Sequence, residues 1–256
     1  MNYWEKRMLD HGHTGWKDPA IYAFDQKIRL EVVKELLSKS NILDTILDHE
    51  GSLLDFGCGS GDFSAFLKDY YKNVYMFDVS EYIVEMAASR VKNSIPISSL
   101  DKLFDIQSSY DTILSVTVLQ HIMDDEEMSL ILQYFNKKLT REGVFLCIET
   151  FPKLGNSMQR NWNCHQFETL MEQNDFVIEE KYDFYYPPAN ELFLAYADTV
   201  YIKILSSLYG NIKFLRKMII NKMQKYASKY NENIYQFIKM GTNDFGTKVY
   251  VLRKKI

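Results

Sequence analysis

The sequence contains few cysteines and no long apolar run. Its three cysteines, Cys58, Cys147 and Cys164, are odd in number and widely spaced, a pattern typical neither of a disulfide framework nor of a zinc site. No apolar stretch approaches the ~18 residues of a membrane span, and the amino terminus is polar where a signal peptide has its apolar core. We therefore expect a protein of the reducing cytoplasm that holds no metal.

A strong excess of charge is missing as well. The 30 basic and 34 acidic side chains leave a formal net charge of -4, which provides no general attraction to nucleic acid. Hydrophobic residues make up 46% of the 256 positions. That is enough for one sizeable core, since single domains reach roughly 250 residues before they split. One elaborated domain is expected.

Strand and helix patterns alternate along the first part of the chain. Apolar spacing predicts helices at 25–37, 41–48, 62–71, 80–90, 124–139 and 163–176. Strands are predicted at 51–57, 73–80, 94–98, 110–119, 143–151, 176–186 and 246–255. Asp62 and Ser80 are expected to cap the helices that begin beside them. The alternation predicts an α/β fold with a Rossmann-like, doubly wound, mostly parallel seven-stranded sheet, which the strand at 246–255 closes as an antiparallel edge.

The expected organisation is a single domain with two additions. The N-terminal helices, residues 1–50, act as a lid. Residues 51–186 and 243–256 form the Rossmann-like core. Residues 187–242, rich in tyrosine, phenylalanine and methionine, interrupt the alternation and form a helical insertion that serves as a lid over the acceptor.

A glycine turn follows the first predicted strand in the stretch LLDFGCGSGDFS, residues 53–64. Ligands of open parallel sheets lie outside the carboxyl ends of the strands, beside such turns. Asp62 stands where the last glycine of a G-x-G-x-x-G dinucleotide fingerprint belongs, and no G-K-[ST] ending marks a phosphate loop. Asp78, which lies 21 residues after Gly57 at the end of the next strand, is spaced to accept hydrogen bonds from two ribose hydroxyls. The turn predicts a ribose-containing ligand without a diphosphate.

Three stretches in order, LLDFGCGSGDFS, VYMFDVSEYIVEMA and YDTILSVTVLQHI, resemble motifs of class I, Rossmann-like S-adenosylmethionine-dependent methyltransferases of the small-molecule type. The resemblance covers residues 53–151. It implies S-adenosyl-L-methionine as cofactor and S-adenosyl-L-homocysteine as product. Positions that match the cofactor site of the family are Asp55, Gly57, Cys58, Gly59 and Gly61 at the methionine end, Asp78 at the ribose, Val79, Ser99 and Leu100 at the adenine, and Ser115 and Val116 at the sulfonium.

His121 is the candidate catalytic residue. It follows the fourth predicted strand in VLQHIMDD, where related small-molecule methyltransferases place a residue that faces the acceptor. An imidazole, with an ordinary pKa near 6.5, takes a proton from a hydroxyl or amine near neutral pH. The alternative is a structural histidine that packs the start of the next helix.

The N-terminal run is dense in large and polar side chains. In related enzymes such segments fold over the cofactor, which implies that Trp16 or Tyr22 covers the methionine chain and that Arg29 pairs with its carboxylate. The alternative is that the tryptophans anchor the segment on the core. His13 is a candidate substrate contact, and a His-x-His metal site is disfavoured.

The insertion carries a local excess of positive charge. Residues 199–231 contain no acid and seven basic side chains: Lys203, Lys213, Arg216, Lys217, Lys222, Lys225 and Lys229. They suit a lid whose lysines bind phosphate, an interfacial helix on anionic lipid, or a packed helix with solvated lysines. The candidate substrate contacts in or near the insertion are Tyr186, Tyr196 and Arg216, with Glu149 as a further candidate in the core.

The overall pattern also resembles bacterial methyltransferases encoded among capsule and surface-polysaccharide genes. It implies methyl transfer to a hydroxyl or amine of a small, phosphorylated or nucleotide-linked metabolite, such as a polysaccharide precursor or its sugar or phosphoramidate decoration. Two alternatives stay open: a membrane-associated methyltransferase of a quinone or lipid precursor, and a non-catalytic module that binds S-adenosylmethionine. Nucleic acid is not expected as a partner, and both a monomer and a homodimer fit the sequence.

Overall fold

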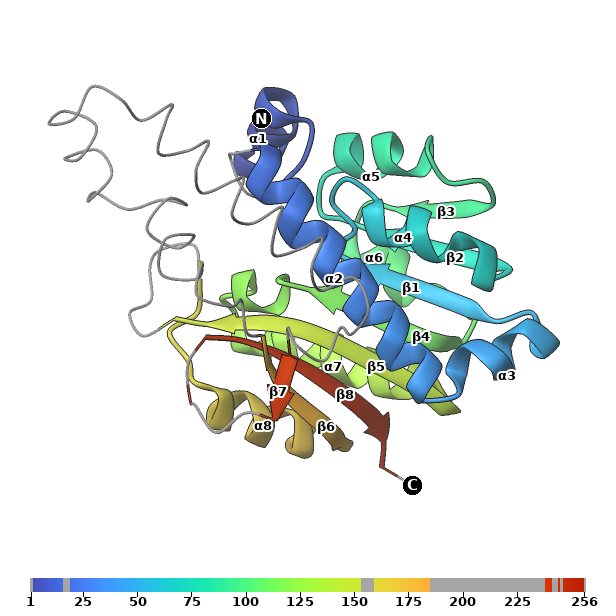
Figure 1. The fold of residues 1–256 in the computed structure, drawn as a ribbon, viewed down its shortest axis with the longest axis vertical. Coiled ribbons are helices and arrows are strands. Elements are labelled where there is room, and N and C mark those ends of the chain that lie inside the picture. The colour runs from blue at the N-terminus through green and yellow to red at the C-terminus, as the bar shows by residue number, and fades with distance from the viewer. Residues whose placement is uncertain are drawn as a thin grey trace, which may run out of the picture. The chain divides into compact units, whose positions relative to one another are not determined.

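The computed structural model describes residues 2–15, 19–152, 159–184, 238–240, 244 and 246–255 (Figure 1). The chain divides into two compact units. The first comprises residues 1–14, 33–184 and 240–256, and the second comprises residues 15–32 and 185–239. The first unit contains the predicted ligand-binding turn.

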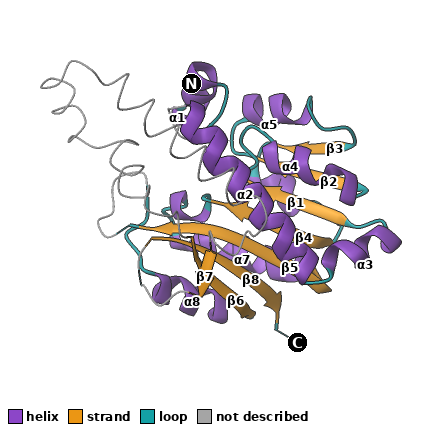
Figure 2. Cartoon of the chain, in the orientation of Figure 1, coloured by secondary structure: helices purple, strands orange, loops and turns teal. Residues whose placement is uncertain are grey.

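The secondary structure follows the predicted alternation (Figure 2). The helices are α1 (Tyr3–His11), α2 (Pro19–Lys39), α3 (Ile42–His49), α4 (Asp62–Leu67), α5 (Glu81–Ala88), α6 (Leu100–Phe104), α7 (Asp125–Lys138) and α8 (Cys164–Gln173), with 3-10 turns η1 (Lys68–Tyr70) and η2 (Leu119–His121). The strands are β1 (Ser52–Phe56), β2 (Asn73–Phe77), β3 (Ser94–Ile97), β4 (Tyr110–Val116), β5 (Leu139–Phe151), β6 (Phe176–Phe184), β7 (Ile238–Met240) and β8 (Gly246–Lys254). Within these ranges, no helix combines the length and apolar character needed to cross a membrane.

The sheet has the order β3-β2-β1-β4-β5-β8-β6, with the three-residue β7 beyond β6. Strands β1 to β5 pair in parallel, whereas β8 runs antiparallel to both β5 and β6. The predicted Rossmann-like, mostly parallel sheet with one antiparallel strand is therefore confirmed. The carboxyl ends of β1, β2 and β4 meet at one edge, as the parallel pairing requires.

The position of β8 differs from the prediction. The sequence analysis places this strand at the edge, but it lies between β5 and β6. The four consecutive residues Val249 to Leu252 are all buried, which is the pattern of a strand covered on both faces and paired on both sides.

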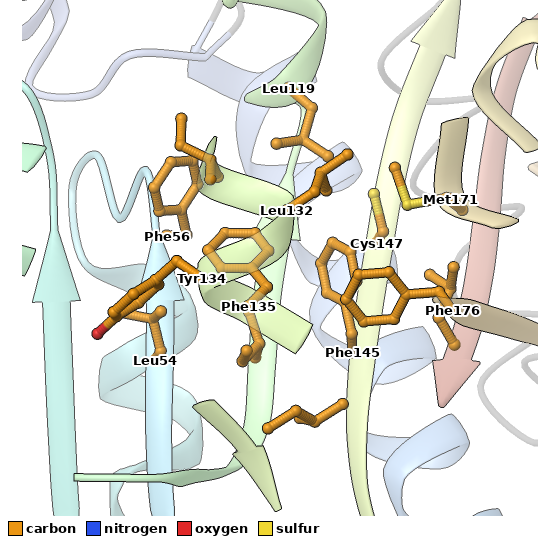
Figure 3. Close-up of a cluster of buried hydrophobic side chains, with 14 of the residues drawn as sticks. Leu54, Phe56, Leu119, Leu132, Tyr134, Phe135, Phe145, Cys147, Met171 and Phe176 are labelled. Carbon is orange, nitrogen blue, oxygen red and sulfur yellow. The ribbon is translucent and has the colours of Figure 1, made fainter. Parts of the chain in front are cut away.

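One face of the sheet packs on α6, α7 and α8 through a continuous apolar cluster (Figure 3). Phe135 of α7 lies at its centre, with ring centroids 4.9 Å from Phe56 of β1 and 5.2 Å from Phe145 of β5. Asp124 caps α7 by accepting a hydrogen bond from the Glu127 amide at 2.7 Å. The three acids of the first turn and the two lysines of the last complement the helix dipole.

On the opposite face, α4 follows the glycine turn directly. The helix begins at Asp62, but its N-cap is Gly61, with φ of 76° and no side-chain cap. The predicted cap by Asp62 is therefore wrong, because the turn needs a left-handed residue immediately before the helix and glycine adopts that conformation without strain. Ser80 does cap α5, accepting a hydrogen bond from the Ile83 amide at 3.3 Å, as predicted.

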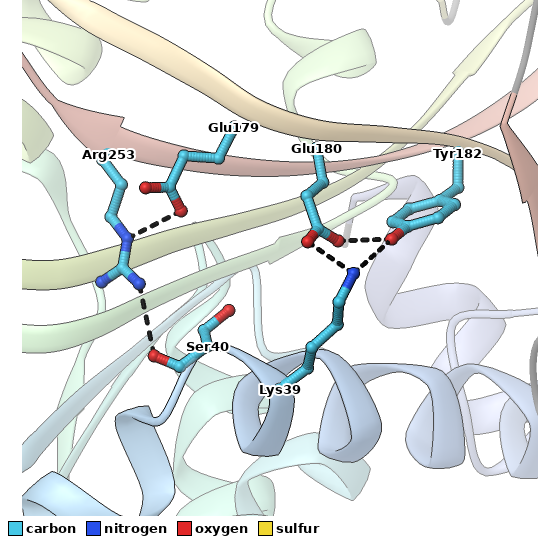
Figure 4. A network of polar contacts seen from close by, with 6 residues as sticks. All are labelled: Lys39, Ser40, Glu179, Glu180, Tyr182 and Arg253. Carbon is cyan, nitrogen blue, oxygen red and sulfur yellow. Dashed lines mark hydrogen bonds and ion pairs between the residues drawn. The ribbon is translucent and has the colours of Figure 1, made fainter.

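The last turn of α2 is tied to β6 by a polar network (Figure 4). Lys39 Nζ donates to Glu180 Oε1 at 2.6 Å and to the Tyr182 hydroxyl at 3.0 Å, and that hydroxyl donates to the other oxygen of Glu180. These contacts raise the pKa of Lys39. Beside them, Arg253 of β8 donates to Glu179 at 3.0 Å and to the Ser40 carbonyl at 3.3 Å. The network holds the end of α2 against the antiparallel half of the sheet.

Phe135 tests the importance of the central cluster. Phe135→Ala is expected to lower the free energy of unfolding by about 3–5 kcal/mol, since the fully buried ring leaves a cavity between two strands. Leu130→Ala on the same helix, where 55% of the side chain is exposed, is the matched control and should change stability by less than about 0.5 kcal/mol. Urea unfolding followed by circular dichroism measures both, and equal effects would contradict this placement of the core.

Candidate functional site

The glycine turn follows β1 and is hydrogen-bonded to the carboxyl end of β2. The amides of Gly57 and Cys58 both donate to the Phe77 carbonyl at 2.8 Å. Gly57 has φ of 76° and Gly59 has φ of 51°, which disfavours any side chain at either position. A Cβ at Gly57 would collide with the side chain of Val118, and one at Gly59 would lie 2.7 Å from Thr14 Oγ1. The turn therefore requires glycine both for its backbone conformation and for close packing.

Asp78 lies at the end of β2, directly beside this turn. Its Oδ2 accepts a hydrogen bond from the Gly59 amide at 3.2 Å, and its Oδ1 accepts one from the Ser80 amide at 3.1 Å. Burial raises the pKa of this carboxyl. Each oxygen of an ionised carboxylate has a further lone pair, so Asp78 retains acceptor capacity for ligand hydroxyls while the protein fixes its orientation.

Asp55 is the second carboxyl of the turn, and it faces the protein interior. Its Oδ2 accepts a hydrogen bond from Ser64 Oγ at 2.6 Å, which ties β1 to α4. Burial raises the pKa of Asp55 to about 6. Burial also raises the pKa of the neighbouring Cys58 thiol. Asp55 and Cys58 thus support the turn from the interior of the protein.

The residues predicted beside adenine lie at the ends of β2 and β3. Val79 follows Asp78 and is 65% exposed, unusual for a large apolar side chain. Ser99 is the N-cap of α6 and accepts a hydrogen bond from the Lys102 amide at 3.3 Å. Leu100 opens that helix and packs partly on the core cluster. An exposed apolar side chain next to a ribose-binding acid suits the flat face of a base.

The turn after β4 is organised by one buried carboxylate. Glu149 of β5 is fully buried, and its oxygens accept hydrogen bonds from the amides of Val118, Leu119 and Gln120 at 3.0, 2.9 and 3.2 Å. Burial raises the pKa of Glu149 to about 7, although the three amides oppose the shift. The carboxylate is thus enclosed and bonded to the backbone, and a contact of Glu149 with the acceptor stays a prediction.

Ser115 is likewise turned inward. It is fully buried on β4, and its hydroxyl donates to Glu149 Oε1 at 3.4 Å. Its side chain therefore serves the interior of the protein, and a place for Ser115 beside the sulfonium stays a prediction. Val116, the last residue of β4, is partly exposed. Thr117 follows with φ of 57°, a conformation that turns the chain sharply at the end of the strand.

His121 ends the 3-10 turn η2 and is partly exposed. Its Nε2 lies 3.1 Å from Nε2 of Gln120. The indole of Trp4 packs edge-to-face on the imidazole, with ring centroids 4.9 Å apart. The candidate catalytic side chain is thus held between its own turn and the N-terminal helix.

The segment 2–14 reaches all three strand ends. Trp4 contacts His121 after β4, Glu5 Oε1 accepts a hydrogen bond from Ser80 Oγ after β2 at 2.9 Å, and Thr14 packs on Gly59 after β1. Glu5 is not among the site residues predicted from the sequence. Its capping box with Asn2, in which each side chain bonds the backbone of the other residue, is visible as the N-x-x-E spacing. That signal predicts a helix start but not the contact with Ser80.

Four predicted site residues, Trp16, Tyr186, Tyr196 and Arg216, lie outside the described residues, as does most of the insertion at 187–242. Tyr22 and Arg29 belong to the second unit, where the Arg29 guanidinium pairs with Asp25 at 2.9 Å. His13 belongs to the first unit and is 6% exposed. Burial lowers its pKa, with the nearby charges of His11 and Arg7 acting in the same direction.

The buried Asp55 generates a prediction for stability. The pKa of Asp55 is about 6 in the folded protein and ordinarily 3.8. The stability that its protonated carboxyl contributes to the fold is therefore complete below pH 4 and is lost as the pH rises through 6. Relative to wild type, Asp55→Asn should gain up to about 3 kcal/mol between pH 4 and pH 7.5. Urea unfolding at both pH values measures the difference. The matched control is Asp69→Asn, whose side chain is 81% exposed, and a difference no larger than that of this control would contradict the assignment.

Comparison with known proteins identifies the class of this site. Residues 54–147 match a family model described as a methyltransferase domain. A protein of Bacillus cereus (strain 03BB102) named as an uncharacterized methyltransferase is 26% identical over 191 residues, which cover 64% of this chain and 90% of the relative.

Two solved structures share the fold. An S-adenosylmethionine-dependent methyltransferase from Clostridium acetobutylicum ATCC 824 has a TM-score of 0.58 at 12% identity, covering 90% of this chain and 92% of that one. An O-methyltransferase from a trans-AT PKS multienzyme of Brevibacillus brevis, in complex with S-adenosyl-L-homocysteine, has a TM-score of 0.52 at 15% identity, covering 90% and 79%. The matched methyltransferase domain spans the glycine turn, Asp78 and the end of β4, and the chain has the Rossmann-like fold that these S-adenosylmethionine-dependent methyltransferases share.

Proposed function

We propose that the enzyme methylates a hydroxyl or amine of a small, phosphorylated or nucleotide-linked metabolite, such as a surface-polysaccharide precursor or its sugar or phosphoramidate decoration. The proposal of methyl transfer is carried by one observation: hydrogen bonds join the glycine turn to the end of β2 and to Asp78. The class of acceptor is supported by the sequence, because residues 199–231 combine seven basic side chains with no acid.

The chemistry of these residues suits the proposed cofactor. Gly57 and Gly59 form a tight turn in the left-handed conformation, and beside it Asp78 offers two oriented oxygens for ribose hydroxyls. Val79 offers an exposed apolar surface for adenine. When bound, S-adenosylmethionine supplies a methyl group on a good leaving group, so the protein's main tasks are alignment and exclusion of water.

The acceptor side of the proposed site is the turn that carries His121. Trp4 covers one edge of the imidazole, and Glu149 fixes the backbone from Val118 to Gln120 beneath it. In the proposal, these fixed groups hold a small acceptor molecule in one orientation beside the end of β4. His121 is proposed to contact the reacting group of the acceptor.

Asp78 provides a test of cofactor binding. Asp78→Asn is expected to weaken S-adenosylmethionine binding by about 10- to 100-fold, since hydrogen bonds to a charged group contribute about 1.5–3 kcal/mol. Wild-type affinity should also fall on acidification at a higher pH than for an ordinary aspartate, because burial raises the pKa of Asp78. Isothermal titration calorimetry measures both effects. Asp105→Asn, exposed after α6, is the control, and equal affinities of the two variants would contradict the ribose role.

The reaction itself is tested with methyl-labelled S-adenosylmethionine and a cytoplasmic small-molecule extract. Label is expected in an acidic, water-soluble product, and treatment of the extract with phosphatase should remove the acceptor. His121→Ala should lower turnover by roughly 10²-fold or more while leaving cofactor affinity unchanged.

Each alternative predicts a distinct result in the same assay. Label found in the lipid fraction would favour a membrane-associated enzyme of a lipid or quinone precursor. Tight cofactor binding without transfer to any acceptor pool would indicate a non-catalytic binding module. Full turnover by His121→Ala would make His121 structural.

A further inference from the structure

The turn after β4 is strained at its first residue. Thr117 has φ of 57°, a conformation that a β-branched side chain keeps only where surrounding contacts impose it. Its amide donates to the Ile148 carbonyl of β5 at 2.6 Å. The next three amides, those of residues 118–120, donate to the carboxyl group of Glu149 on the same strand. Four consecutive amides thus hold a strained turn against β5.

The two carboxyl oxygens of Glu149 accept different numbers of hydrogen bonds. Oε1 accepts from the amides of Val118 and Leu119 at 3.0 and 2.9 Å and from the Ser115 hydroxyl at 3.4 Å. Within the part of the chain that the structure describes, Oε2 accepts from the Gln120 amide alone, at 3.2 Å. A proton on Oε1 would disturb three hydrogen bonds, whereas a proton on Oε2 disturbs one. Oε2 is therefore the oxygen that takes the proton when Glu149 becomes neutral.

The charge of Glu149 and the hydrogen bonds of the turn are linked. Burial raises the pKa of Glu149 to about 7, and the three amides act in the opposite direction. Because these amides favour the ionised form, protonation must weaken their hydrogen bonds by the same free energy. The bond from the Gln120 amide ends on the oxygen that is protonated, so it weakens most.

Ionisable groups of the sheet also face Glu149. On β5 itself, Sγ of Cys147 lies 3.9 Å from Oε1, and burial raises the pKa of this thiol, with Glu149 acting in the same direction. On β8, the fully buried Lys248 stands opposite Glu149 in the strand register, on the same face of the sheet, and pairs with Asp183 of β6. The thiol is therefore neutral near pH 7, and the nearby cation favours the ionised carboxylate.

The turn brings two further ionisable groups, His121 and Arg160, close to Gln120. His121 is the next residue, and the Arg160 amide donates to the Gln120 carbonyl at 2.8 Å, while its guanidinium pairs with Asp125. The side-chain Oε1 of Gln120 accepts from the Thr150 amide at 3.0 Å. Gln120 is thus anchored on two other sides, so loss of its bond to Glu149 shifts the turn without unfolding it.

We infer that Glu149 is a positioning residue whose ionised carboxylate holds the turn after β4 in the form that supports methyl transfer. Protonation weakens the hold on Gln120 and lets the strained turn relax toward His121. Val118 stays bonded to Oε1 and keeps its place against Gly57, so the glycine turn is little affected. The role in turnover rests on the proposed function, whereas the link between the carboxyl and the turn does not.

NMR on the wild-type protein tests this link. Glutamate labelled with ¹³C at Cδ reports the ionisation of Glu149, whose signal is the one lost in Glu149→Gln, and ¹⁵N labelling reports the amides of residues 118–120. The pH is lowered from about 8.5 until the Glu149 signal completes its shift. The Gln120 amide is expected to move most of the three, with the same midpoint as the carboxyl, because its acceptor oxygen takes the proton.

Glu149→Gln replaces the carboxyl by a group that does not titrate, so the pH transition of the Gln120 amide should vanish. Glu142→Gln makes the same change on the same strand, where the side chain is 82% exposed, and should keep the wild-type transition. A Gln120 amide that does not follow the carboxyl in wild type, or that keeps its full transition in Glu149→Gln, would overturn the proposal. The wild-type titration decides alone if Glu149→Gln does not fold.

Turnover at saturating cofactor tests the functional role once an acceptor is known. At about pH 8, Glu149→Gln is expected to lower kcat by about 10-fold or more, because the turn with His121 is displaced, and to change the cofactor Kd by less than about 3-fold. Wild-type kcat should fall as the pH passes below the midpoint of the Glu149 carboxyl, and Glu149→Gln should lack this acidic limb.

An unchanged kcat in Glu149→Gln, or an acidic limb that this variant retains, would overturn the role in turnover. A wild-type protein that transfers no methyl group to any acceptor would contradict the proposed function instead. The NMR titration needs no turnover, so it decides the link between Glu149 and the turn in either case.

Discussion

The site depends on one buried carboxylate. Glu149 is enclosed in the sheet and bonds three consecutive amides of the turn after β4. An ionised group in such surroundings is costly unless it is fully hydrogen-bonded, and this requirement fixes the path of the turn. Val118, the first residue held in this way, packs where a Cβ at Gly57 would lie. The glycine turn and the turn after β4 are therefore placed relative to one another by a single ionisable group.

The N-terminal segment connects the same places from the opposite side. Its contacts with His121, Ser80 and Gly59 join the ends of three strands that are far apart in the sequence. Glu5 also brings a second negative charge close to Asp78, which contributes to the raised pKa of that carboxyl. In its proposed role Asp78 is ionised and accepts two ribose hydroxyls, so the electrostatics of the first helix bear on the proposed cofactor binding.

The elements and the cofactor turn could be predicted because their signals are local. The glycine spacing, the acid after β2 and the serine before α5 each serve a nearby backbone group, so the sequence pattern contains both partners. The predicted cap by Asp62 failed, and the inward bonds of Ser115 and Glu149 were not predicted, for a common reason. In each case the sequence had to predict the direction of a polar side chain. That direction is set by a partner on another element or by the backbone angles of a neighbouring residue.

The sequence by itself determined the order of strands and helices, the glycine turn and the identity of the methyl donor. The elements and the turn follow from periodicity and from short-range chemistry, whereas the methyl donor follows from the resemblance of three motifs to class I methyltransferases. Only the tertiary structure decided that β8 lies inside the sheet, that Glu149 serves the backbone and that Gln120 faces His121. The place of β8 is set by its pairing with β5 and β6. The other two facts are set by hydrogen bonds between β5 and the turn after β4, whose partners are separated by about 30 residues of chain.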